Sequence, residues 1–129
     1  MTTGTPAHTV LIVDDQRVVL RVFAQVLEGA GYRVLLADSA DAALDSVRRD
    51  VPDAILIDLT MPYVNGMGLL YRLRDIAPQI PMAMITGMRT VGDETREGLQ
   101  ALGIALHFKP LSPPQIEELV GTLVAKRRA

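Results

Sequence analysis

The chain has 129 residues, which is enough for one domain with a buried core and too few for two ordinary domains. Hydrophobic residues make up 49% and charged residues 22%, and the formal net charge of −2 predicts no general affinity for nucleic acid or for an acidic membrane surface. Cysteine is absent, which excludes disulfides and thiolate metal sites and suits a cytoplasmic location.

The N-terminal segment MTTGTPAHT has neither the basic region nor the apolar region of a secretory signal. No apolar run approaches the ~18 residues that span a bilayer, so we expect no membrane association. Composition predicts a flexible tail over residues 1–8, a folded domain over 9–126 and a short C-terminal tail over 127–129.

Short apolar segments alternate with segments of helical periodicity along the whole chain. The apolar segments predict strands at 10–13, 32–37, 54–58, 80–86 and 104–108. The periodic segments predict helices at 16–29, at 39–49, through Leu69, Leu70 and Leu73, at about 90–102, and from Ser112 onward. This alternation predicts a parallel sheet that is covered by helices on both faces.

The last helix carries the clearest local signal in the sequence, SPPQ at 112–115. Ser112 can cap the helix, Pro113 stands where a missing N–H costs nothing, and Gln115 completes a capping box.

Polar side chains follow four of the five predicted strands. Asp14 and Asp15 follow the first strand, Asp58 ends the third, Thr86 ends the fourth and Lys109 follows the fifth. Right-handed crossovers bring the carboxyl ends of parallel strands to one edge of the sheet, where open α/β proteins bind their ligands. We therefore expect these side chains to form one site.

The residue types at this edge indicate a particular chemistry. Three carboxylates with no cysteine or paired histidine suit a hard divalent cation, Mg²⁺ before zinc or copper. Lys109 adds a mobile positive charge suited to a phosphoryl oxygen, and Thr86 adds a hydroxyl donor. The residues alone leave open whether the phosphoryl group is a passing substrate or becomes attached to the protein.

Four motifs in order resemble the response regulator receiver family: DD at 14–15, ILIDLTMPYVNG around Asp58, MIT ending at Thr86, and FKP at 108–110. The similarity covers residues 8–126. It implies a flavodoxin-like (βα)5 three-layer sandwich with a five-stranded parallel sheet of order 2-1-3-4-5. It also implies a phosphorylation switch of two-component signalling that turns over no free substrate.

The resemblance implies a role for each matching residue. Asp58 would accept a phosphoryl group from the phosphohistidine of a sensor histidine kinase or histidine phosphotransfer protein. Asp14, Asp15, Asp58 and the backbone carbonyl of Thr60 would hold Mg²⁺. Lys109 would pair with the carboxylate or its phosphoryl group, with a cis bond to Pro110, and Thr86 would move toward the phosphoryl group. The cognate kinase, the output domain or partner protein, and formation of a homodimer stay open.

The sequence departs from the family pattern near the expected output face. Leu106 stands where the family usually has Tyr or Phe, three residues before the lysine. The segment from Thr86 to Gly103 is about two residues longer than typical, and the link from Gly103 to Lys109 about one shorter. Thr60 and Met88 occupy positions that tune phosphoryl lifetime in the family, and a methionine offers no group to help a hydrolytic water.

Other functions fit the residues less well. A Mg²⁺-dependent phosphohydrolase with an aspartyl nucleophile usually has a second Asp where this chain has Thr60. A flavin or nucleotide binder would need a Gly- or Ser/Thr-rich loop where DDQRVV stands. A receiver used only for protein contacts has no need of these acids. We expect His107 to be packed rather than catalytic, and the exposed-looking Tyr63 and Val64 to touch a partner.

Overall fold

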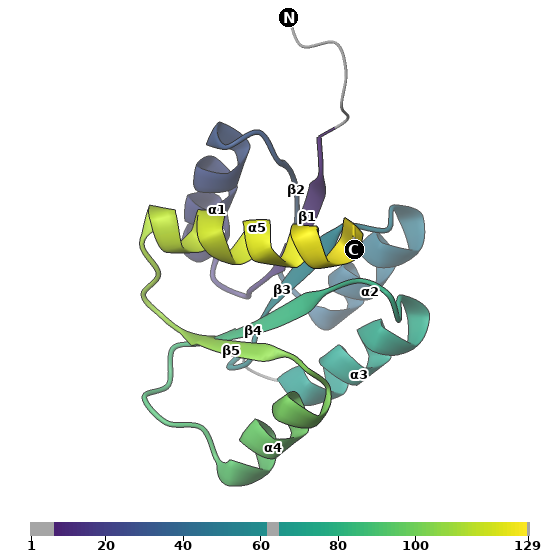
Figure 1. Ribbon diagram of the computed structural model, residues 1–129, viewed down its shortest axis with the longest axis vertical. Coiled ribbons are helices and arrows are strands. Elements are labelled where there is room, and N and C mark those ends of the chain that lie inside the picture. Colours follow the sequence, from purple (N-terminus) through teal and green to yellow (C-terminus); the bar gives the residue numbers. More distant parts are fainter. Residues whose placement is uncertain (1–6, 62–64, 129) are drawn as a thin grey trace, which may run out of the picture.

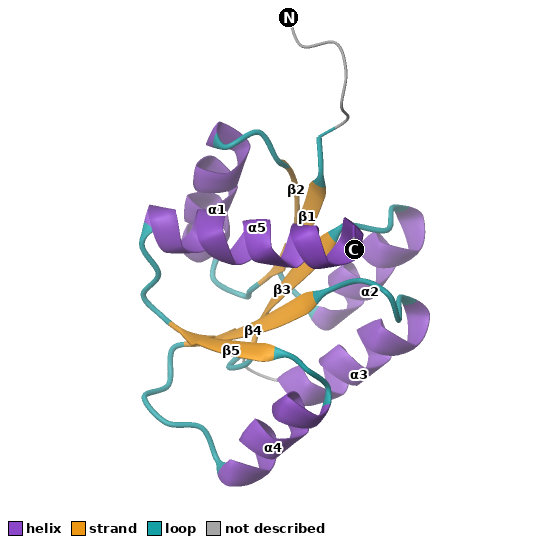
Figure 2. Ribbon diagram, in the orientation of Figure 1, coloured by secondary structure: helices purple, strands orange, loops and turns teal. Residues whose placement is uncertain are grey.

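The computed structural model describes residues 7–61 and 65–128, so most of the expected N-terminal tail, as well as Tyr63 and Val64, lies outside the described residues. Five strands alternate with five helices in this part of the chain (Figure 2). The strands are β1 (Thr9–Val13), β2 (Arg33–Ala37), β3 (Ala54–Asp58), β4 (Met82–Thr86) and β5 (Ala105–Phe108). The helices are α1 (Arg17–Gly29), α2 (Ala40–Arg49), α3 (Gly66–Ile76), α4 (Asp93–Ala101) and α5 (Pro113–Arg128).

The strands form one parallel sheet of order β2-β1-β3-β4-β5, as the sequence and the family resemblance predicted. Helices α1 and α5 cover one face, and α2, α3 and α4 cover the other (Figure 1). The fold is therefore the expected flavodoxin-like three-layer sandwich, and every strand ends at the same edge.

Burial along the strands follows their place in the sheet. All residues of the three central strands β1, β3 and β4 are buried, because helices cover both faces. The edge strands β2 and β5 are only partly buried. The continuous apolar runs of the sequence thus mark the central strands, from which the acidic residues emerge.

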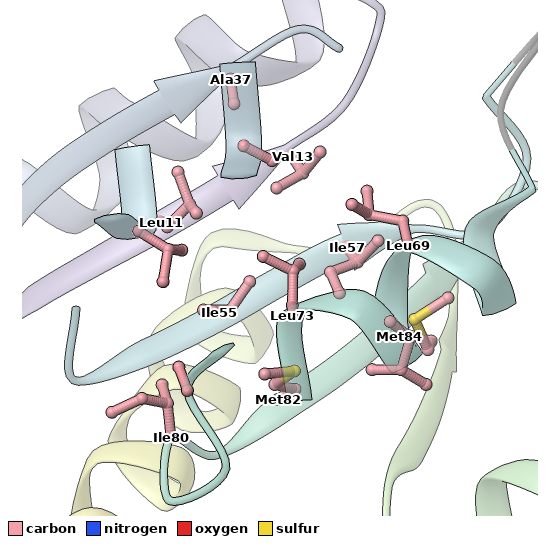
Figure 3. Close-up of a cluster of buried hydrophobic side chains, with 14 of the residues drawn as sticks. Leu11, Val13, Ala37, Ile55, Ile57, Leu69, Leu73, Ile80, Met82 and Met84 are labelled. Atoms are coloured by element: carbon pink, nitrogen blue, oxygen red, sulfur yellow. The ribbon is translucent and has the colours of Figure 1, made fainter. Parts of the chain in front are cut away.

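Alternation of side chains divides the core into two clusters, one on each face of the sheet. Leu11, Ile55 and Met84 point toward α2, α3 and α4, where Leu73 packs on them (Figure 3). Their neighbours along the strands join a second cluster with α1 and α5. The register of the strands is fixed because a shift by one residue would move each side chain to the other face.

Two predicted boundaries differ from the structure by more than one residue. β4 begins at Met82 rather than residue 80, because Ile80 donates its N–H to Ala77 in a turn and Pro81 has no N–H for the ladder. α4 begins at Asp93 rather than about residue 90, after the extended Gly92. Asp93 and Glu94 then place negative charge at the positive end of the helix dipole.

The predicted capping box at the start of α5 is confirmed. The N–H of Ser112 donates to Gln115 Oε1 at 2.8 Å, and the N–H of Gln115 donates to Ser112 Oγ at 3.3 Å. These bonds fix the turn that links Lys109 to α5.

Candidate functional site

The structure brings together charged side chains from three strand ends. Lys109 Nζ donates to Asp14 Oδ2 at 2.8 Å and to Asp58 Oδ2 at 3.4 Å. Asp15 adds a third carboxylate, and one oxygen from each of Asp14, Asp15 and Asp58 lies within 4.8 Å of the other two. The predicted convergence of these four residues is confirmed. They come together because β1, β3 and β5 end at the same edge of the sheet.

Burial makes the electrostatics of this cluster costly. Asp14 is 3% exposed and Asp58 is 4% exposed, and Asp15 is more exposed than either. Three negative charges face one ammonium group, so the mutual repulsion of the carboxylates is only partly offset. The site therefore has an excess of negative charge that favours another cation.

The protonation equilibria reflect these surroundings. Burial raises the pKa of Asp14, and its hydrogen bonds from Lys109 and Gln16 only partly counteract this effect. Burial lowers the pKa of Lys109, but the hydrogen bonds and charges of Asp14 and Asp58 outweigh it, so that the pKa is raised above its ordinary value. Lys109 is therefore held as a cation.

Backbone and side-chain donors fix the two buried carboxylates. The N–H of Gln16 donates to Asp14 Oδ1 at 2.9 Å. The N–H of Thr60 donates to Asp58 Oδ1 at 3.0 Å, and the Thr60 hydroxyl donates to the same oxygen at 2.9 Å. The family resemblance implied a carbonyl ligand at Thr60 and a position that tunes phosphoryl lifetime, but not this hydrogen bond from the Thr60 hydroxyl to Asp58. A hydroxyl residue two positions after an aspartate at a strand end was the available signal.

Thr86 lies fully buried at the end of β4. Its hydroxyl accepts a hydrogen bond from the N–H of Met88 at 3.1 Å, and its carbonyl accepts one from the N–H of Lys109 at 2.8 Å. The backbone of Thr86 is thus tied to Lys109, and its side chain is tied to the loop that leads to α4.

The donor set suits a hard divalent cation. Carboxylate oxygens are the ligands that Mg²⁺ and Ca²⁺ take, and the described residues bring three of them together without a competing histidine or thiolate. The acidic triad can therefore bind a metal, which the sequence predicted. The expected share of the Thr60 carbonyl in that coordination stays a prediction.

The fifth strand carries Leu106, the residue that stands three positions before Lys109. Leu106 is partly buried and packs against the core cluster on the α4 side, whereas Phe108 is 38% exposed. The guanidinium of Arg96 in α4 lies 6.0 Å from the centre of the Phe108 ring. The peptide bond between Lys109 and Pro110 is cis, as the resemblance implied.

One cavity of the described residues lies away from the carboxylates. A groove of about 340 Å³ runs between β5 and α5 and is lined by residues that include His107, Glu118 and Lys126. Burial lowers the pKa of His107. A metal and a phosphoryl group bind at charged rims more readily than in apolar grooves, so the strand-end cluster remains the candidate site.

None of the described helices is long and apolar enough to cross a membrane.

Comparisons with known proteins agree with this geometry. The family model for the response regulator receiver domain matches residues 10–121. The polar-differentiation response regulator DivK of Brucella ovis is 31% identical over 115 residues, which cover 87% of this chain and 92% of DivK. A receiver domain protein (CheY-like) from Methanospirillum hungatei JF-1 has a crystal structure that superposes with a TM-score of 0.87 at 26% identity, over 95% of this chain and 97% of that one.

Other relatives are much longer than the chain. A protein named probable transcriptional regulatory protein TcrX, from Mycobacterium tuberculosis, is 34% identical over 125 residues, which cover 97% of this chain and 51% of TcrX. The chain therefore spans about half the length of this relative. With the family model matched over most of its length and the acidic cluster at the expected strand ends, the chain belongs to the response regulator receiver domain family.

Proposed function

We propose that the chain is a phosphorylation switch in which Asp58 accepts a phosphoryl group, with Mg²⁺ as the cofactor. The observation that carries this proposal is the buried Asp58, 3.4 Å from a lysine and clustered with two further carboxylates. Receiver domains are in general signalling switches rather than enzymes, and the family implies a kinase as partner. The donor would be the phosphohistidine of a sensor histidine kinase or of a histidine phosphotransfer protein, and the proposed compartment is the cytoplasm.

The proposed step is a displacement at phosphorus. An oxygen of Asp58 uses a lone pair to form a new P–O bond, and the bond from phosphorus to the donor nitrogen breaks, leaving its electron pair on the imidazole. Phosphoryl transfer depends mainly on alignment and charge neutralisation rather than covalent help from the protein. The hydrogen bonds from Thr60 hold the Asp58 carboxylate in place, and Lys109 supplies positive charge beside it.

Mg²⁺, when bound, would neutralise charge on the phosphoryl oxygens. Asp14, Asp15, Asp58 and the Thr60 carbonyl are the proposed ligands, supported by the closeness of the three carboxylates. The new phosphoryl group requires hydrogen-bond donors, and Thr86 is proposed to turn its hydroxyl toward it. That movement would release the bond from Met88 and so alter the loop before α4.

Incubation with acetyl phosphate, with and without Mg²⁺, followed by intact mass measurement tests the proposal. We expect Mg²⁺-dependent addition of one phosphoryl group, and its loss in Asp58→Asn. Asp45→Asn, on the surface of α2, is the matched control and should still be phosphorylated. Failure to form an adduct under any of these conditions, together with failure to bind beryllofluoride, would contradict the proposal and favour a receiver used only for protein contacts.

A further inference from the structure

We propose that the edge of the sheet opposite to the acidic cluster is a docking surface for an acidic segment of a partner protein that also carries apolar side chains. Two adjoining hollows lie at this edge, where the strands β3, β4 and β5 begin and where the helices α3 and α5 end (Figure 1). None of the residues proposed for phosphorylation lines either hollow, so the inference goes beyond the proposed function and is independent of it.

The two hollows share the loop between α3 and β4 as a common wall. Residues 78–80 of this loop line both of them. The walls of the first hollow, of about 250 Å³, include Arg74 and Lys126. The walls of the second hollow, of about 270 Å³, include Val51, Ile76 and Arg127. A ligand that lies across the loop can therefore reach both hollows.

The first hollow brings together two cations from different helices. Arg74 stands in the last turn of α3 and is partly buried, and Lys126 stands near the end of α5. Neither side chain forms an ion pair with another residue in the described part of the chain. A partly buried guanidinium bears a cost of desolvation that a carboxylate would offset. The first hollow therefore has an excess of positive charge that favours an acidic ligand.

Two carboxylates that precede β3 have partners of their own. Asp50 pairs with Arg33, and Asp53 accepts the N–H of Thr9 at 2.8 Å. No carboxylate of the described residues lines either hollow. The positive charge of the first hollow is thus open to acidic groups from another molecule.

The second hollow adds apolar surface to the positive charge. Val51 and Ile76 line it, and both are large apolar side chains that the fold leaves exposed. Arg127 lines the same hollow. Exposed apolar side chains beside a cation favour a partner that covers the apolar groups and pairs with the charge.

These features together favour a peptide over a bare anion or a nucleic acid. The C-terminal ends of α3 and α5 present backbone carbonyl groups, which accept N–H groups of a peptide and repel a bare anion. No described aromatic residue lines either hollow, so nucleotide bases would find no stacking partner there. An acidic peptide with apolar side chains matches the cations, the carbonyl groups and the exposed apolar surface at once.

Peptide selection tests the inference on the unphosphorylated wild-type chain. A phage-displayed library of random peptides of about twelve residues is first depleted on Arg74→Gln/Lys126→Gln and then selected on the wild type. We expect the selected peptides to be enriched in Asp or Glu and in apolar residues, because both hollows would contribute to binding.

Fluorescence polarisation with a selected peptide measures its Kd. In the double variant the Kd should rise about tenfold or more, because the charged partners of the peptide are lost. Arg17→Gln/Arg21→Gln removes an equal charge from exposed positions of α1 and should hold the Kd within about twofold of the wild-type value. Val51→Ser should raise the Kd about threefold, whereas Val18→Ser, at an exposed valine of α1, should not.

A second readout needs no variant and decides the matter even if the double variant does not fold. In the ¹H–¹⁵N spectrum of the wild type, the selected peptide should shift the resonances of Gln79 and Gly103, which line the first hollow. The resonance of Gly66, at the far end of α3, should stay in place.

The inference would be overturned if no peptide remained after depletion, if the remaining peptides lacked acidic enrichment, or if their binding left Gln79 and Gly103 unshifted. Binding of inorganic phosphate or of a DNA oligonucleotide as tight as that of the peptide would assign the surface to another ligand and contradict the inference. Sedimentation showing a dimer that Arg74→Gln/Lys126→Gln abolishes would contradict it as well, since the occupant would be a second copy of the chain.

Discussion

At the scale of single residues, Thr60 shows how a side chain that carries no charge can organise a charged site. Its N–H and hydroxyl converge on one oxygen of Asp58, a carboxylate that is almost fully buried. A buried carboxylate that loses a donor keeps its cost of burial without the compensating bond. The side chain of Thr60 therefore contributes to the stability of the fold as well as to the orientation of Asp58.

Thr60→Val keeps the shape of the side chain and its backbone N–H but removes the hydroxyl. We expect the free energy of unfolding without metal to fall by about 1–2 kcal/mol, since hydrogen bonds to charged groups are worth more than neutral ones. Urea denaturation in the presence of a chelator measures this. Thr60→Ser retains the hydroxyl and should lose clearly less. Equal losses in the two variants would show that the methyl group, and not the hydroxyl, matters.

The charged residues of the site could be predicted from the sequence, whereas their hydrogen bonds could not. Asp14, Asp58 and Lys109 follow apolar segments directly, so strand topology alone places them at one edge. The preference of Lys109 for Asp14 depends on side-chain distances of a few tenths of an ångström, which no pattern of residue types encodes.

At the scale of elements, the start of α3 is constrained by a close approach of its backbone to that of Leu59. A Cβ atom built on Gly66, the first residue of α3, would lie 2.9 Å from the carbonyl oxygen of Leu59 and 3.0 Å from its Cα. These neighbours are main-chain atoms and cannot move aside as a flexible side chain would. Gly66 thus lets α3 begin directly beside the segment that follows Asp58.

Gly66→Ala should destabilise the domain by about 1–3 kcal/mol, in the range of overpacking a tight site. Gly68→Ala, two residues later in the same helix, is the control, because its Cβ would meet the Asn65 side chain at an ordinary 3.5 Å. Alanine is also the better helix former, by about 1 kcal/mol. Chemical denaturation should therefore give Gly68→Ala a free energy of unfolding equal to or greater than that of the wild type. Gly66→Ala should have a smaller free energy of unfolding than the wild type. The reverse order would contradict the close approach.

Elements were predictable where local signals agreed with burial. The capping box of α5 was confirmed because Ser112 and Gln115 satisfy each other without distant partners. The predicted start of α4 at about residue 90 was wrong, because Val91 is buried in the loop before Gly92 and the helix begins at Asp93.

At the scale of the whole molecule, the buried Asp14 and the half-buried His107 give opposite contributions to stability as the pH falls. The raised pKa of Asp14 means that the folded state binds its proton more readily, so protonation of Asp14 favours folding in acid. The lowered pKa of His107 has the opposite effect, because the unfolded chain takes up that proton first.

His107 should therefore cost stability as the pH falls below about 6.5, the ordinary pKa of histidine. We expect the free energy of unfolding of the wild type to fall relative to that of His107→Gln between pH 7.5 and pH 5.5. Denaturation curves for both proteins at several pH values isolate the contribution, because Asp14 is common to both. A constant difference between the two proteins across this range would show that His107 is not the group responsible.

Because the acids lie at strand ends, the site tolerates one kind of change in chain length and not another. Deleting one residue within β3 would turn Asp58 to the opposite face and dismantle the cluster, because side chains alternate along a strand. A change of length in the loop at 87–92 leaves the carboxylates where they are, since most of that loop is exposed. The length of the chain can thus vary beside the site without disturbing the hydrogen bonds between strands that hold the charged residues in place.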